Sequence, residues 1–241
     1  ITGLAGGDII DGGDGDNSVD AGDGNDQVTT GAGNDTVDAG AGDDVVTTGA
    51  GDDSVDGSTG NDSLLGGEGN DTILGGDGND TIGNFTVDGD DSIDAGAGAD
   101  DINDWYGQNT ILGGDGNDSI DGSGPSIDGG AGNDRIVVYR DFSGADSAVT
   151  VTGGLGDDTI STSSFSNSIN FLGVTLDGGD GNDSISGTNL TNGAPELLIG
   201  GDGDDTLTGN AGGDTNREGA GYGKRFPQDE DHTGRGSTEK K

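Results

Sequence analysis

Branched apolar residues recur every nine positions along the first third of the chain, separated by polar stretches rich in glycine and aspartate. From Gly3 to Gly83 nine such units follow one another without a gap, each with its branched residue at the eighth place. These residues are Ile10, Val19, Val28, Val37, Val46, Val55, Leu64, Ile73 and Ile82. Because most of them favour extended backbone, the last three residues of each unit are predicted to form a short strand with one inward side chain, and the first six to form a turn.

A second period of 18 residues lies over the first. Residues 20–37 read DAGDGNDQVTTGAGNDTV, and residues 38–55 read DAGAGDDVVTTGAGDDSV. One coil is therefore predicted to hold two units, so that alternate units stack at the usual strand spacing of about 4.8 Å. This places Asp20, Asp38 and Asp56 in one ladder and the pairs Thr29-Thr30 and Thr47-Thr48 in another. The sequence thus predicts an all-β fold of stacked parallel coils.

The regular two-sided pattern ends at residue 83, and residues 84–121 carry weaker units after the insertion Asn84-Phe85. Within them the turn 104–109 has lost both leading glycines and the sixth-place aspartate. We predict that it is the poorest ion site in the chain. Its Trp105, the only tryptophan, is interpreted either as an aromatic cover over a vacant site or as a recognition patch.

From residue 122 to residue 214 the coils lengthen. Full units begin at Gly129, Gly153, Gly178 and Gly200, spaced by 24, 25 and 22 residues, with apolar runs between them. We predict that each of these coils retains one ion-binding turn and replaces the opposite one with a longer, strand-bearing half. Residues 215–241 have mixed charge and no period, and are interpreted as a flexible tail, a cap or an engineering remnant.

The net negative charge of the chain opposes folding in the absence of a neutralising counterion. It has 48 acidic against 8 basic residues, a formal net charge of -40 and only 26% hydrophobic residues. Such a composition predicts disorder until the carboxylates are neutralised, and it argues against nucleic acid as a partner. No apolar run approaches the length of a membrane span, so membrane insertion is not expected. The chain has no cysteine to supply disulfides.

A carboxylate recurs at the sixth place of the units. Two stacked turns would offer two carboxylates and several carbonyls exposed by glycine, an all-oxygen shell that suits Ca²⁺ better than Mg²⁺ or Zn²⁺. The predicted pairs join Asp26 with Asp44 and Asp44 with Asp62 on one side, and Asp35 with Asp53 and Asp53 with Asp71 on the other. Asn17 and Asn109 are the exceptions. The candidate ligands of multiple Ca²⁺ ions are Asp8, Asp26, Asp35, Asp44, Asp53, Asp62, Asp71, Asp80, Asp91, Asp100, Asp118, Asp134, Asp158, Asp183 and Asp205.

Motifs for catalysis are missing from the sequence. Neither His-Glu-x-x-His nor Gly-x-Ser-x-Gly occurs, and the single histidine lies in the aperiodic C-terminal segment. A catalytic triad or a histidine-ligated metal cannot be assembled from these residues. The sequence therefore predicts that this chain is not an enzyme.

Units such as GGEGNDTIL and GGDGNDTIG closely resemble the RTX nonapeptide repeats of bacterial secreted proteins, and the resemblance extends from Gly3 to about Asp214. It implies a right-handed parallel β-roll, or β-helix solenoid, with Ca²⁺ in the GGxGxD turns. It also implies export through a type I exporter and folding only after export into calcium. Two features depart from the family: the C-terminal segment contains lysine and arginine where the export signal is usually free of them, and the half-coils after Gly122 are unusually long.

Three functions are compatible with these features. The favoured one is a non-catalytic, secreted calcium-binding module that serves as a structural part of a surface layer, adhesin or extracellular filament. Its partners would be calcium ions and either further copies of itself or cell-surface and matrix components. The alternative is a secretion and folding tract of a type I-secreted toxin or hydrolase, which a catalytic or pore-forming domain in the parent gene would reveal. Ice binding by the threonine ladder is the third, but that ladder spans few coils.

Overall fold

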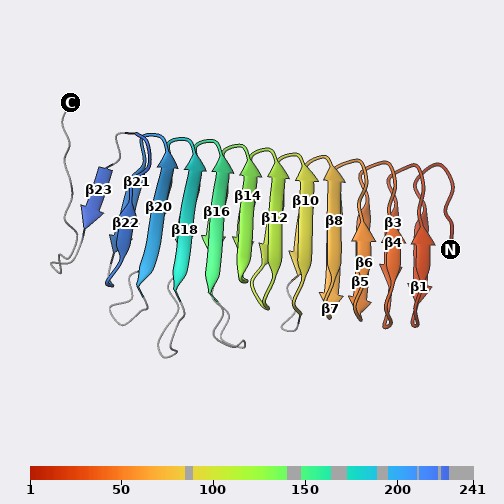
Figure 1. Cartoon of the computed structure of the whole chain (residues 1–241). Helices are drawn as coiled ribbons and strands as arrows, with labels where there is room; N and C mark the ends of the chain where they lie inside the picture. Colours follow the sequence, from red (N-terminus) through yellow and green to blue (C-terminus); the bar gives the residue numbers. More distant parts are fainter. Residues whose placement is uncertain are drawn as a thin grey trace.

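The structure is a computed structural model that describes residues 1–84, 89–139, 148–163, 173–188, 195–210, 212–221 and 224–227. None of these residues is helical, and the described chain has no helix of the length and apolarity needed to cross a membrane. The strands wind as successive coils of an elongated solenoid (Figure 1). The prediction of an all-β parallel solenoid is confirmed.

Two parallel sheets run the length of the solenoid, and successive strands alternate between them. The odd-numbered sheet has 12 strands and the even-numbered sheet has 11. The odd-numbered strands are β1 (Ile9–Gly13), β3 (Gln27–Thr30), β5 (Val45–Ala50), β7 (Ser63–Glu68), β9 (Thr81–Asn84), β11 (Asp101–Asp104), β13 (Ser119–Gly122), β15 (Arg135–Val138), β17 (Thr159–Thr162), β19 (Ser184–Ser186), β21 (Thr206–Asn210) and β23 (Lys224–Pro227). The even-numbered strands are β2 (Ser18–Asp20), β4 (Thr36–Asp38), β6 (Ser54–Asp56), β8 (Thr72–Asp77), β10 (Ser92–Ala97), β12 (Thr110–Asp115), β14 (Ser126–Ala131), β16 (Val149–Leu155), β18 (Val174–Asp180), β20 (Glu196–Asp202) and β22 (Thr215–Arg217).

The strand register sets the length of each coil. In the first coils residues 18 apart pair across the sheets, as Val28 with Val46 and Asp20 with Asp38. The insertion after β9 lengthens one coil, so that Ile93 pairs with Ile73. Phase is kept throughout, because each coil still presents one inward branched residue to each sheet.

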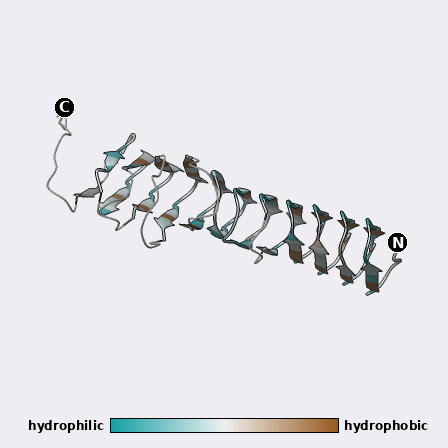
Figure 2. Ribbon diagram, turned by 90° about the horizontal axis from the view of Figure 1, so that it is seen from below, coloured by the Kyte–Doolittle hydropathy of each residue, from teal (hydrophilic) through white to brown (hydrophobic). Residues whose placement is uncertain are grey.

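The core is a double row of these eighth-place residues. From Val19 to Leu207 they are buried, with exposed fractions of 2% or less. Hydrophobic segments accordingly recur from coil to coil along the whole length (Figure 2). One side chain per strand makes a thin core, since each buried valine, leucine or isoleucine contributes about 1.5–3 kcal/mol. The turns must therefore hold the coils together as much as the core does.

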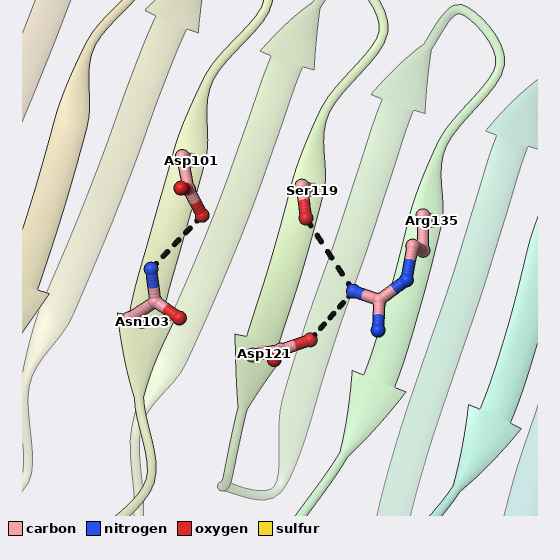
Figure 3. Close-up of polar contacts among 5 residues, drawn as sticks. All are labelled: Asp101, Asn103, Ser119, Asp121 and Arg135. Carbon is pink, nitrogen blue, oxygen red and sulfur yellow. Dashed lines mark hydrogen bonds and ion pairs between the residues drawn. The ribbon is translucent and has the colours of Figure 1, made fainter.

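The outward faces of the sheets carry polar side chains. Arg135 on β15 reaches back across the odd-numbered sheet to the carboxylate of Asp121 at 2.7 Å and to the hydroxyl of Ser119 at 3.4 Å (Figure 3). The threonine pairs do not form an exposed double row, because Thr30 and Thr48 are buried and only Thr29 and Thr47 lie on the outer face.

The C-terminal segment extends both sheets. β22 pairs with β20, and β23 pairs with β21. The strand β22 carries Asn216 at the place where other coils have a branched apolar residue, and the Oδ1 atom of this side chain is buried without a hydrogen-bond partner. The described part of residues 215–241 thus contains two short strands.

Candidate metal sites

The turns that connect the two sheets stack along two edges of the solenoid. The turns leading into the odd-numbered strands form what we term the continuous edge, at the top of Figure 1. Those leading into the even-numbered strands form the interrupted edge, at the bottom. All the aspartates predicted from the sequence lie in these turns, immediately before a strand. The alternation of units between two sides of the coil therefore follows from the strand order.

One unbroken column of carboxylates follows the continuous edge. The backbone N–H of each sixth-place residue donates to the Oδ1 atom of its counterpart in the next coil, at distances from 2.7 to 3.1 Å. The predicted pairs Asp26–Asp44 and Asp44–Asp62 are joined in this way. The column consists of Asp8, Asp26, Asp44, Asp62, Asp80, Asp100, Asp118, Asp134, Asp158, Asp183 and Asp205.

The column on the interrupted edge is shorter. The same hydrogen bonds join Asn17, Asp35, Asp53, Asp71, Asp91 and Asn109 in order. Register then places Pro125, Val149 and Val174 at this position, none of which can bind a cation through its side chain. Carboxylates return with Glu196 and Asp214, where the Glu196 N–H donates to Asp214 at 3.0 Å.

The fifth-place residue forms a second ladder of opposite direction. Its side-chain oxygen accepts the backbone N–H of the fifth-place residue one coil later, as in Asn61 to Asn79 at 2.8 Å and Asn70 to Asp90 at 2.8 Å. Each Asn-Asp pair thus connects a turn to both of its neighbours. The repeated Asn-Asp dipeptides therefore have a structural cause that the strand pattern alone did not reveal.

The sixth-place carboxylates are buried, and only one of their two oxygens accepts a ladder hydrogen bond. All the predicted aspartates except Asp8 are exposed by 4% or less. Their Oδ1 atoms accept the ladder hydrogen bonds, but many Oδ2 atoms are buried without a hydrogen-bond partner among the described residues. These are the Oδ2 atoms of Asp26, Asp35, Asp44, Asp53, Asp62, Asp80, Asp100, Asp118, Asp134, Asp158, Asp183 and Asp205. A buried, unpaired anionic oxygen is costly, so this geometry calls for a cation.

The electrostatics of the column point the same way. Burial, reinforced by the carboxylates of adjacent coils and opposed by the ladder hydrogen bond, raises the pKa of Asp62, Asp100 and Asp158 to about 7. Burial likewise raises the pKa of Asp134 and Asp183 to about 6. Without a cation the column accommodates its negative charge poorly at neutral pH.

Each carboxylate faces a small space lined by oxygen. At Gly113, the first residue of its unit, a Cβ atom would lie 2.6 Å from Asp118 Oδ2 and 2.5 Å from the carbonyl oxygen of Gly129 in the next coil. Gly75 stands in the same relation to Asp80 Oδ2, at 2.6 Å. First places on the continuous edge hold only glycine or alanine. Carboxylate and carbonyl oxygens therefore converge beside the smallest residues, as a hard cation requires.

Within the described residues no group of three or more His, Cys, Asp or Glu side chains is placed to hold a metal ion. Any ion in these turns therefore needs carbonyl ligands as well. Comparison with protein families matches the RTX calcium-binding nonapeptide repeat (4 copies) over most of the chain, at residues 1–28, 20–55, 29–64, 47–82, 86–103, 106–124, 126–138, 142–169, 174–189 and 191–215. The chain belongs to the RTX calcium-binding repeat family. Searches of curated proteins and of solved structures returned no match.

As an RTX repeat protein, the chain binds multiple Ca²⁺ ions, which confirms the predicted family, cofactor and calcium partner. The residues present fit this ion, because the orphaned Oδ2 atoms and converging carbonyls supply only oxygen. Ions held in these turns would supply the positive charge that the buried columns lack.

The side-chain amides of Asn17 and Asn109 are hydrogen-bonded within their own turns. Asn17 donates through Nδ2 to the carbonyl of Gly13 at 3.1 Å, and Asn109 donates to the carbonyl of Tyr106 at 2.5 Å. In these turns an amide N–H stands where an aspartate would present Oδ2.

Two buried carboxylates, Asp104 and Glu196, were not among the predicted ligands, and neither was the half-buried Asp214. Asp214 stands at the sixth place of the last unit, so periodicity could have identified it. Asp104 and Glu196 lie outside the sixth place of any consensus unit, and only the register shows that they face a turn.

Proposed function

We propose that the sixth-place aspartates are the calcium ligands and that the chain is a non-catalytic, extracellular structural module that folds when calcium binds. The observation that carries the proposal is the continuous column, in which the Oδ2 atoms from Asp26 to Asp205 are buried without a hydrogen-bond partner among the described residues. Only the folded chain holds these groups together. The free energy of calcium binding to the column therefore contributes to the free energy of folding.

Within each turn of the continuous edge the ligands would be the Oδ2 atom of the sixth-place aspartate and the first-place carbonyl of the next coil. Asp118 with the Gly129 carbonyl is one such pair. The Oδ1 atom holds the neighbouring turn through its hydrogen bond, so each interior aspartate would act on two gaps. We extend the proposal to Asp8, which is part of the same column although it is less buried.

Residues 1–83 and 122–214 are proposed to differ in the number of edges that bind calcium. In the longer coils Pro125, Val149 and Val174 take the place of carboxylates on the interrupted edge. We infer that calcium binds along one edge there and along both edges in residues 1–83.

An extracellular, structural role is supported by charge and architecture. A chain of net charge -40 needs a plentiful counterion, and calcium sites of extracellular modules operate at about 10⁻⁴ to 10⁻³ M. Solenoid coils fill nearly all of the described chain. A surface layer, adhesin or filament would use these properties. Ice binding is not proposed, because Thr30 and Thr48 are buried.

Circular dichroism with calcium titration tests the proposal. In EGTA at neutral pH the chain should give a disordered spectrum, and added Ca²⁺ should restore the β signal cooperatively, whereas Mg²⁺ should not. A full β signal in chelator would show that the fold does not depend on calcium. A toxin or hydrolase tract remains the alternative function, and a catalytic or pore-forming domain encoded beside this segment would support it.

A further inference from the structure

The turn formed by residues 104–109 breaks the repeat and yet contains a buried carboxylate. Asp104 ends β11 at the first place of its unit and is 1% exposed. Its Oδ2 atom has no hydrogen-bond partner in the described part of the chain. The carboxylate is therefore as enclosed as those of the regular columns, although nothing in the consensus places one here.

Register shows where this side chain points. Asp104 pairs with Asn84 before it and Gly122 after it, in the column of first-place residues on the interrupted edge. A first-place side chain on this edge is directed at the sixth-place residue of its own turn: a Cβ on Gly66 would meet the carboxylate of Asp71. In the unit that begins at Asp104 the sixth-place residue is Asn109, which is fully buried.

Asn109 keeps the ladder but lacks the charge. Its Oδ1 atom accepts the N–H of Asp91 at 2.9 Å, as an aspartate would. Its Nδ2 atom donates to the carbonyl of Tyr106, and the Asn109 side chain is also hydrogen-bonded to Asp104. This turn therefore has no carboxylate at the sixth place but has one at the first place, that of Asp104.

Other residues at the first place on this edge show why a carboxylate requires a cation. Thr30 and Thr48 donate their hydroxyl protons to the first-place carbonyls of the following coil, Thr30 to Thr48 at 2.8 Å and Thr48 to Gly66. A threonine at the first place is thus paired with a carbonyl through its own proton. An ionised carboxylate has no proton to donate. Burial first and the charge of Asp91 second raise the pKa of Asp104, against the lowering effect of hydrogen bonds from the Tyr106 backbone and the Asn109 side chain.

We propose that Asp104 is a calcium ligand and that the turn 104–109 is a site of exchanged composition, with its carboxylate at the first place, Asn109 at the sixth and Asp91 of the preceding coil as the second carboxylate. The proposal rests on the calcium-dependent fold proposed above. It replaces our sequence-based interpretation of this turn as the poorest ion site.

The neighbouring Trp105 makes this turn selectively observable. It is the only tryptophan of the chain, and Tb³⁺ in place of Ca²⁺ emits after tryptophan excitation only when the two lie close together. We expect tryptophan-sensitised Tb³⁺ emission from the wild-type chain and its loss by several-fold in Asp104→Asn. Asp183→Asn makes the same change on the continuous edge, far along the solenoid, and should lower total calcium binding without lowering this emission. Trp105→Phe should remove the emission.

Undiminished emission from a folded Asp104→Asn variant would overturn the proposal and leave Asp104 as a protonated, unliganded group. If that variant fails to regain its β signal in calcium, Asn109→Asp decides. If an ion lies between Asp104 and residue 109, the second carboxylate should tighten Tb³⁺ binding and lower the midpoint of the Tb³⁺ titration. If no ion lies there, the second carboxylate adds negative charge to a closed space and should weaken folding with no gain in emission. Both outcomes differ from failure of the calcium-dependent fold, in which the wild-type chain shows no response to calcium by circular dichroism.

Discussion

Adjacent asparagine and aspartate side chains act in opposite directions along the stack. In the dipeptide Asn79-Asp80, Asn79 accepts the N–H of Ala99 in the next coil, whereas Asp80 accepts the N–H of Asp62 in the previous one. The aspartate leaves its second oxygen inside the turn, while the asparagine lies exposed at the surface. Both residues therefore join adjacent coils, and only the aspartate keeps an oxygen inside the turn for the ion that we propose.

Removing one charge from the continuous edge should weaken calcium binding locally. Asp118→Asn preserves an oxygen that can accept the Asp100 N–H but removes the anionic Oδ2 that faces Gly113. We expect fewer bound ions by calorimetry and a several-fold higher calcium midpoint by circular dichroism. Asp115→Asn, at the third place of the same unit, is the matched control and should change neither. Equal effects of the two substitutions would show that the sixth place has no special role.

The fourth-place glycine is required by the backbone. Gly78 has φ +140°, and a Cβ atom there would collide with the carbonyl of Gly60 in the preceding coil. Gly78→Ala should therefore destabilise the calcium-bound chain by about 1–3 kcal/mol in thermal or chemical unfolding. Asp77→Ala, at the exposed neighbouring place, should leave the unfolding transition unchanged, and a loss of similar size there would contradict the steric explanation.

At the scale of the element, the unit of structure is two nonapeptides. The first unit of each pair leads into the odd-numbered sheet and the second into the even-numbered sheet, and their first-place residues differ. Ala39 stands on the continuous edge, whereas Thr30 and Thr48 on the interrupted edge donate their hydroxyl protons to the first-place carbonyls of the following coil. Units that look equivalent in the sequence are therefore not interchangeable.

Deletion variants test this alternation. Removing residues 39–56 takes out one complete coil and keeps every later unit on its own edge, so folding in calcium should persist. Removing only residues 39–47 moves every later unit to the opposite edge, which would place the long half-coils on the continuous edge. We expect that variant to lose its cooperative β signal, measured by circular dichroism in calcium. Equal folding of both variants would contradict the distinction between the two edges.

Periodicity was sufficient to predict the coils, the core and the position of most of the carboxylates. The eighth-place residues from Val19 onward are buried as expected, since alternation in a strand fixes which side chain turns inward. Asp104 could not be found in this way because it stands at the first place of its unit, and Glu196 could not because it lies in a longer half-coil outside any consensus unit. Their position depends on strand register, which a local pattern does not determine.

For the whole molecule, calcium and protons compete for the same buried oxygens. Burial raises the pKa of Asp62, Asp100 and Asp158 from 3.8 to about 7, so the folded chain without calcium holds protons more tightly than the unfolded chain. This stability is fully present below about pH 4 and is lost as the pH rises through about 7.

In calcium-free buffer the β signal should therefore increase as the pH falls from about 8 to about 5. With calcium present the binding midpoint should move to higher calcium concentration over the same range, because ligands must lose their protons to bind. Circular dichroism and calcium titration at several pH values measure both trends. A calcium-free β signal that grows with rising pH would contradict the electrostatic account.

The unequal length of the two carboxylate columns has a mechanical consequence. One edge of the rod is joined by ladder hydrogen bonds from Asp8 to Asp205, whereas the opposite edge lacks them at Pro125, Val149 and Val174. With calcium bound along both columns, the rod would resist bending that opens the continuous edge more than bending that opens the interrupted one, and under tension its middle coils would yield first. Single-molecule stretching in calcium should show this as an early extension step that Asp20–Asp56 coils do not share. The chain would then act as a stiff element with a compliant centre, tuned by the calcium around it.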